Sequence, residues 1–76
     1  MKIIVEKQSG AIKYVFDDSE SIVLLDYQIK LEGKVICDLN NINSILIENV
    51  TLPNDFELVK YLYIDGNFII NEAIVI

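Results

Sequence analysis

The sequence predicts an all-β fold: a small antiparallel sandwich or partly open barrel of six or seven short strands, built from hairpins. Short apolar runs rich in β-branched residues recur along the chain at intervals of about ten residues. Turn-forming Gly, Asn, Asp and Ser residues separate these runs. No window carries a convincing helical stripe of apolar side chains. We therefore expect one domain over residues 1–76.

The N-terminal region predicts a first hairpin. Residues 2–7 form a strand, Gln8-Ser9-Gly10 reverses the chain, and residues 11–16 return beside it. Alternation along the returning strand sorts its side chains into two faces, Ile12, Tyr14 and Phe16 on one and Lys13 and Val15 on the other. A polar connection, residues 17–20, follows.

The middle of the chain predicts a second hairpin with longer strands. Residues 21–31 alternate as one strand, Glu32-Gly33 forms the turn, and residues 34–39 return with Val35, Cys37 and Leu39 on one face. Asparagines at positions 40, 41 and 43 end this pairing because their side chains compete for backbone hydrogen bonds. Residues 44–50 form a further strand.

The C-terminal region carries the clearest turn signal. Residues 60–64 and 67–70 flank Asp65-Gly66, and Asp-Gly between alternating apolar residues is typical of a two-residue hairpin. Pro53 interrupts the preceding segment because it cannot donate to a sheet ladder. The one candidate for a helical turn is residues 55–62, with Asp55 as its cap. Residues 72–76 extend the last strand or pair at an edge.

Composition excludes several classes of function. The chain has 12 acidic residues, six lysines and a net charge of −6, with no arginine or histidine. Nucleic-acid binding generally needs a cationic surface, so we expect no nucleic-acid partner. No segment approaches the roughly 18 apolar residues that span a bilayer, so we expect no membrane partner. The single cysteine, Cys37, cannot form an internal disulfide, which favours a cytosolic protein.

We expect no catalytic residue, metal ligand or cofactor. Without histidine, no serine, threonine or cysteine has a neighbouring base to activate it. Cys37 alternates with Val35 and Leu39 and is interpreted as a small core residue. The acidic group at 17–20 lacks the alternate spacing and the glycine of a calcium loop. We interpret it, and the pair Asp55 and Glu57, as solvated loops.

The candidate partner-binding residues are aromatic or lie in the tail: Tyr61, Tyr63, Phe68, Ile74 and Ile76. Tyr61 and Tyr63 share a face of one strand, and Phe68 lies nearby across the turn. They either stabilise the sheet through cross-strand pairs or form a contact surface. The tail isoleucines each cost about 1.5–3 kcal/mol if left in water, so the tail docks on its own sheet or augments a neighbour's. A chain this small buries only about 60% of its surface, which favours self-association.

An ordered series of segments resembles a known group of proteins: Lys2-Ile3-Ile4-Val5, Lys13-Tyr14-Val15-Phe16-Asp17-Asp18, the run from Glu48 to Phe56, Lys60-Tyr61-Leu62-Tyr63 and Asp65-Gly66-Asn67-Phe68. The chain resembles, over most of its length, short uncharacterised proteins of tailed bacteriophages that are often encoded among virion structural genes. In two places it departs from that pattern. Ile64 interrupts Lys-Tyr-x-Tyr-Asp-Gly, and Phe68 stands where tryptophan is common. The resemblance implies a phage origin and transfers no functional residue.

These observations predict a non-catalytic bacteriophage protein that acts through protein–protein contacts, as a capsid-decorating or tail accessory of the virion. Its partner would be a virion or host protein, it would form homo-oligomers, and it would be found in the virion or the host cytoplasm. The alternative is an acidic inhibitor that binds a host enzyme or a bacterial defence complex through a basic groove. A third possibility is a carbohydrate- or small-molecule-binding domain that uses the three aromatic residues.

Overall fold

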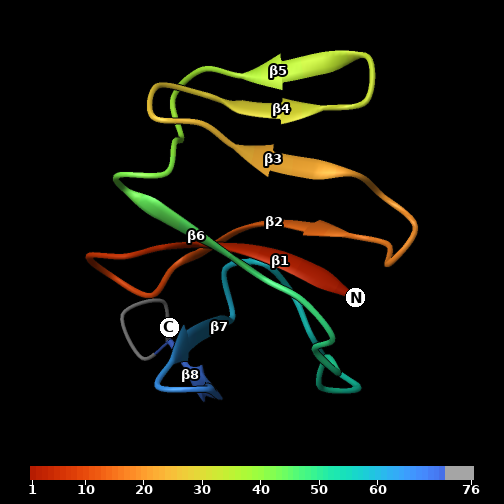
Figure 1. Cartoon of the computed structure of the whole chain (residues 1–76). Coiled ribbons are helices and arrows are strands. Elements are labelled where there is room, and N and C mark those ends of the chain that lie inside the picture. Colours follow the sequence, from red (N-terminus) through yellow and green to blue (C-terminus); the bar gives the residue numbers. More distant parts are fainter. Residues whose placement is uncertain (72–76) are drawn as a thin grey trace.

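The computed structural model describes residues 1–71 and confirms the all-β class (Figure 1). Its eight short strands are β1 (Lys2–Glu6), β2 (Ile12–Phe16), β3 (Ile22–Leu24), β4 (Ile29–Leu31), β5 (Lys34–Ile36), β6 (Ser44–Ile47), β7 (Tyr61–Ile64) and β8 (Asn67–Ile70). They form three open antiparallel sheets with the strand orders β2-β1-β6, β3-β4-β5 and β7-β8. The described part of the chain has no helix that could span a membrane.

The sheet β2-β1-β6 lies between the other two and is covered on both faces (Figure 1). Ile4 faces β3-β4-β5 and packs with Ile29, Leu31 and Leu39. Its neighbours Ile3 and Val5 point to the opposite side, where Ile12 and the aromatic side chains of the last hairpin pack against them. Burial on both faces explains why β1 carries a continuous apolar run, Ile-Ile-Val, and does not alternate apolar with polar residues.

The first hairpin is confirmed, but the predicted faces of its second strand are wrong at Ile12. Ile4 lies opposite Tyr14 and Val5 lies opposite Ile12, so Lys13 is an extra residue in β2. Because side chains alternate along a strand, one inserted residue moves Ile12 to the other face. Ile12 is therefore buried with Ile3 and Val5, away from Phe16, which packs against the cluster around Ile4.

Residues 21–31 form two strands and not the single long strand that the alternation predicts. A turn at Asp26 and Tyr27 separates β3 from β4, and Leu25 N–H donates to the carbonyl of Gln28 at 2.8 Å. The chain reverses, so Ile22 pairs with Leu31. Tyr27 alternates with Leu25 in sequence but lies at the turn, with 74% of its surface exposed.

The face predicted for residues 35–39 is wrong for Val35 and Cys37. Ile36 is the residue of β5 that lies opposite the buried Ile29 and packs against the cluster around Ile4. Val35 and Cys37 are exposed, so Cys37 is not a core residue. Leu39 is buried, as expected, because the chain bends after β5 toward the central sheet.

The last hairpin has the predicted two-residue turn. Asp65 and Gly66 have φ angles of 51° and 82°, as in the mirror-image turn that matches the twist of paired strands. Before it, residues 53–60 form two successive turns, closed by Phe56 N–H to the carbonyl of Pro53 and Lys60 N–H to the carbonyl of Glu57. No helical turn forms there. The predicted extension over residues 72–76, with Ile74 and Ile76, lies outside the described residues.

Candidate functional site

The structure brings the three predicted aromatic residues together on the inner side of the last hairpin. Tyr61, Tyr63 and Phe68 are half-buried and pack against the cluster of Ile3, Val5 and Ile12. Phe68 lies edge-on to Tyr63, with ring centroids 5.0 Å apart, and edge-on to Tyr61 at 6.3 Å. This packing accounts for much of their surface. Their role in partner binding stays a prediction, and Ile74 and Ile76 lie outside the described residues.

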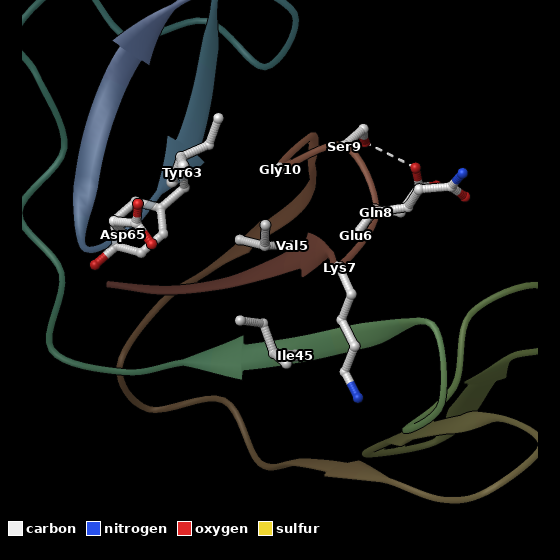
Figure 2. A pocket seen from close by; sticks show the side chains of 10 residues that line it. Val5, Glu6, Lys7, Gln8, Ser9, Gly10, Ile45, Tyr63 and Asp65 are labelled. Carbon is white, nitrogen blue, oxygen red and sulfur yellow. Dashed lines mark hydrogen bonds between the residues drawn. The ribbon is translucent and has the colours of Figure 1, made fainter.

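Tyr63 also reaches a groove at one end of the central sheet (Figure 2). Val5 of β1 and Ile45 of β6 lie side by side on the sheet face that lines it. The turn formed by residues 6–10 makes one wall, and residues 63–65 make the other. Ile45 retains 40% of its surface although its neighbour Val5 retains 2%. The groove is thus the part of this sheet face that the last hairpin leaves uncovered.

The wall formed by residues 6–10 is held by hydrogen bonds within the turn. Ser9 Oγ donates to Glu6 Oε1 at 2.7 Å (Figure 2) and accepts from Ala11 N–H at 3.1 Å. Gly10 N–H donates to the carbonyl of Glu6 at 2.9 Å. Short polar side chains that bond to nearby backbone are typical of turns. These bonds lie within the turn and give the wall a defined shape.

Gly10 joins the two walls. Its carbonyl accepts from Tyr63 N–H at 2.8 Å, which docks the first turn on β7. Gly10 has a φ of 76°, and a Cβ added to it would lie 2.7 Å from Ile64 Cγ1 and 3.2 Å from the carbonyl oxygen of Tyr63. Only glycine fits both the positive φ and this close approach. The position of the last hairpin therefore depends on a glycine in the first turn.

The charged side chains that line the groove are two acids and one lysine. Glu6 and Asp65 both line it, one on each wall. The carboxylate of Glu6 has a single, loose ion pair, with Lys13 Nζ at 3.8 Å, and no ion pair is found for Asp65 among residues 1–71. Lys7 Nζ donates to the carbonyl of Asn41 at 3.0 Å, on the far side of β6 from Asp65 (Figure 2). Figure 2 shows the carboxylates of Glu6 and Asp65 at opposite ends of the groove, and that of Glu6 is engaged by Ser9.

A second polar cluster lies outside the groove, where the loop before β7 meets that strand. Asp55 accepts from Lys60 Nζ and from the Tyr61 hydroxyl, each at 2.7 Å. The pKa of Asp55 lies below its ordinary value. The hydrogen bond from Lys60 is the largest cause of this lowering, and the hydrogen bond from Tyr61 is the second. Asp55 in turn raises the pKa of Lys60 and of Tyr61. A tyrosine made less acidic is a poor base or nucleophile, so we interpret this exposed cluster as a clamp on the loop.

No protein-family model, curated protein or solved structure matches this chain. The candidate site is therefore argued from geometry. Within the described residues, no group of three or more His, Cys, Asp or Glu side chains could hold a metal ion. Sequence reasoning missed Ile45 and Ile64, because nothing in a local pattern shows that β6 ends a sheet or that the last hairpin stops short of Ile45.

Proposed function

We propose that this chain is a non-catalytic protein that acts through protein–protein contacts. The observation that supports this proposal is that more large apolar side chains are exposed to solvent than are buried in the core. Within the described residues, seven hydrophobic side chains are buried, whereas twelve large ones are at least 36% exposed. The exposed ones are Met1, Tyr14, Val23, Tyr27, Val35, Ile42, Ile45, Leu58, Val59, Ile64, Ile69 and Ile70. Covering such surface is the main gain of protein association.

The concrete form of this proposal is an accessory protein of a tailed-phage virion that binds the capsid or tail and self-associates. The resemblance to short phage proteins supports this form. The fold is compatible with it, because each of the three sheets has at least one edge strand with a neighbour on one side only among the described residues: β2, β3, β5, β6 and β8. Such edges offer backbone groups to a further strand.

Two measurements on the full chain test this proposal. Light scattering over a range of concentrations should show a mass above that of the monomer, and the purified chain should sediment with purified phage particles but not with unrelated particles. Val35→Lys places a charge on the exposed outer face of β3-β4-β5 and should weaken self-association if that face is used. A strict monomer at high concentration that fails to sediment with particles contradicts the proposal.

A second candidate function, an acidic inhibitor of a host enzyme or defence complex, is favoured by the placement of some carboxylates. In the register, Lys2 lies beside Phe16, Ile3 beside Ile47 and Ile22 beside Leu31. The following five acidic residues therefore extend from the same end of the two larger sheets: Asp17, Asp18, Glu20, Glu32 and Glu48. The same end also carries Lys2, Lys34 and the N-terminal ammonium, which pairs with Asp18 at 2.7 Å. The five acids there exceed these three cations by two, and this surplus suits a basic groove on a partner.

Salt dependence separates this candidate from the first. Binding of the chain to a host nucleic-acid enzyme should weaken steeply as salt rises, and should compete with DNA for the enzyme. A variant with Asp17→Asn, Glu20→Gln and Glu48→Gln should lose this binding, whereas Asp26→Asn, Glu57→Gln and Asp65→Asn, which remove three acids elsewhere, should retain it. Equal effects of the two triple variants would exclude a specific acidic surface.

A further inference from the structure

We propose that the outer face of β3-β4-β5 docks on the same face of a second copy of this chain, with Lys30 of each copy paired to Glu32 of the other. This inference rests on the proposed function and specifies the surface through which the chain self-associates. It depends on three features of the described residues: exposed valines on that face, one cation beside one anion, and a hollow that both charged residues line.

The register separates the two faces of β3-β4-β5. Ile29 is fully buried against the central sheet, and Ile36, which lies opposite it, packs against the same core. Because successive side chains of a strand point to opposite faces, the next row along the strands points away from that core. This row consists of Val23, Lys30 and Val35, which lie beside one another, and each valine keeps 48% of its surface exposed. The outer face is therefore apolar on both edge strands and charged on β4.

A hollow lies beside this row on the outer face. It is lined by Ser21, Val23, Lys30, Leu31 and Glu32. Ile22 lies opposite Leu31, so Ser21, just before β3, falls at the level of Glu32, just after β4. The side chain of Ser21 is shorter than that of Val23, which occupies the next outward position of the same strand. The face thus has a larger side chain next to a recess.

The charges on this face favour a second copy as the partner. The chain has a net charge of −6, so two copies repel each other over most of their surface. The hollow, by contrast, is lined by one cation, Lys30, and one anion, Glu32, and neither has an ion pair among residues 1–71. Lys34 lies opposite Leu31 and so belongs to the other face. A face with one charge of each sign is neutral and can complement itself.

A two-fold axis produces this complementarity. Identical chains associate most often about such an axis, with the same patch on both sides of the contact. An axis that lies between the copies and crosses the strands over Leu31 reverses the direction of one sheet, so that Lys30 of each copy faces Glu32 of the other. The same rotation places Val23 of each copy over Ser21 of the other, in the hollow. An axis along β4 would instead set Lys30 against Lys30 of the second copy.

The experiment measures the mass of the full chain by sedimentation equilibrium over a range of concentrations. A reducing agent is present, because Cys37 is exposed and could otherwise link two copies through a disulfide. Strands of three residues form a small face, so we expect a weak dimer whose population rises with protein concentration. Over the same range, the amide resonances of Val23, Lys30, Glu32 and Val35 should shift.

Two charge reversals test the pairing. Lys30→Glu and Glu32→Lys should each weaken the dimer about tenfold, because each change acts twice across the two-fold axis and sets like charges against each other. An equimolar mixture of the two variants should associate about as tightly as the unaltered chain, since one copy then presents two acids and the other two lysines. The control Lys34→Glu makes the same change of net charge on the other face of this sheet, and its effect should be much smaller.

Glu32→Lys also separates pairing from net charge. It removes one acid and adds one lysine, which changes the net charge from −6 to −4. If only repulsion between whole chains mattered, this variant would associate more tightly than the unaltered chain, whereas pairing with Lys30 predicts weaker association. The matched control Glu57→Lys makes the same change in the loop before β7 and should not weaken the dimer.

The outcomes distinguish this inference from the proposed function. Resonance shifts confined to the other two sheets, tighter association of Glu32→Lys than of the unaltered chain, or a mixture of folded reversed chains that stays monomeric would overturn the inference. If a reversed chain fails to fold, the resonance shifts of the unaltered chain decide. A chain that sediments with phage particles but stays monomeric, or associates through another face, leaves the proposed function standing and shows that this interface is wrong.

Discussion

Asn40 and Asn43 hydrogen-bond to each other's backbone. Asn43 Oδ1 accepts from Asn40 N–H at 2.9 Å, and Asn40 Oδ1 accepts from Asn43 N–H at 3.0 Å. Asn43 Oδ1 also accepts from the hydroxyl of Ser44, at 2.8 Å, and Ser44 has no exposed surface. This reciprocal pair forms the turn that carries the chain from β3-β4-β5 into the central sheet, and it places the first residue of β6.

Asn43→Ala should lower the free energy of unfolding by about 1–3 kcal/mol, because it leaves the buried Ser44 hydroxyl without its acceptor. Asn41→Ala is the matched control. Its side chain is exposed, and the hydrogen bonds found for Asn41 are made by its backbone. Denaturant-induced unfolding of the two variants compares them directly. Equal stability losses would show that the side-chain pair does not stabilise the turn.

Gly10→Ala should destabilise the protein more than Gly66→Ala. Both glycines have positive φ, 76° and 82°, where an added Cβ costs about 1–2 kcal/mol. At Gly66 nothing lies within 4 Å of that Cβ, whereas at Gly10 it would meet Ile64 Cγ1 at 2.7 Å. The extra loss at Gly10 measures how closely the first turn docks on the last hairpin.

A second measurement assigns that loss to docking. Hydrogen exchange at Tyr63 N–H, which bonds to the carbonyl of Gly10, should speed up in Gly10→Ala relative to Gly66→Ala. Unchanged protection of this amide would mean that the two elements are held together by other contacts.

The Asp55 clamp predicts a pH dependence. A carboxyl whose pKa is lowered in the folded state stabilises it above its ordinary pKa, and this stabilisation is lost as pH falls through the lowered value. Lys60 and Tyr61 have raised pKa values, so their stabilisation is present below their ordinary pKa values and lost as pH rises through the raised ones. In Asp55→Asn, the free energy of unfolding should therefore fall less steeply in the acidic range, where Asp55 titrates, and in the alkaline range, where Lys60 and Tyr61 titrate. Between these ranges its dependence on pH should be unchanged.

Titration of the Asp55 carboxyl by NMR tests which partner matters most. Lys60→Met should raise the pKa of Asp55 more than Tyr61→Phe does, because the hydrogen bond from Lys60 is the larger cause of its lowering. The clamp is exposed, so both effects on stability should be small and should shrink with added salt. The reverse order would assign the lowering to the phenol.

Ile3→Val and Ile4→Val should each lower the free energy of unfolding by about 0.5–1.5 kcal/mol, although adjacent residues of a strand face opposite ways. Ile3 and Ile4 are both fully buried, one under the aromatic hairpin and the other under β3-β4-β5. The control Ile42→Val removes the same methylene from a side chain that is 71% exposed, and should have little effect. A small effect at one of the two core positions would mean that one face of β1 is loosely covered.

Local patterns failed where one residue changed the side-chain phase. Lys13 looks like an ordinary outward residue of an alternating strand, yet as a bulge it moves Ile12 to the other face. Tyr27 continues the alternation of residues 23–31 but lies in a turn closed between Leu25 and Gln28. Alternation of apolar and polar residues indicates which side chains share a face of a strand. It does not indicate where a bulge or a turn interrupts that strand.

The candidate groove was only partly predictable. The sequence predicts Tyr63 as a contact residue, and Tyr63 lines the groove; Asp65-Gly66 predicts the hairpin that carries it. The sequence does not indicate Ile45, because its exposure depends on how far the last hairpin extends over the central sheet. That coverage depends on Gly10, whose close approach to Ile64 joins segments far apart in the sequence.

The sequence by itself determined the all-β class, the two hairpins at residues 2–16 and 60–70, and the break in strand pairing at the asparagines before β6. Each follows from conformational preferences of neighbouring residues. Only the tertiary structure decided that β1 lies in the middle of three layers, that β6 is its partner, and that one end of the face near Ile45 stays open. These three features depend on which apolar surfaces pack together, and those surfaces belong to segments far apart in the sequence. The conformational preferences of neighbouring residues carry no information on that packing.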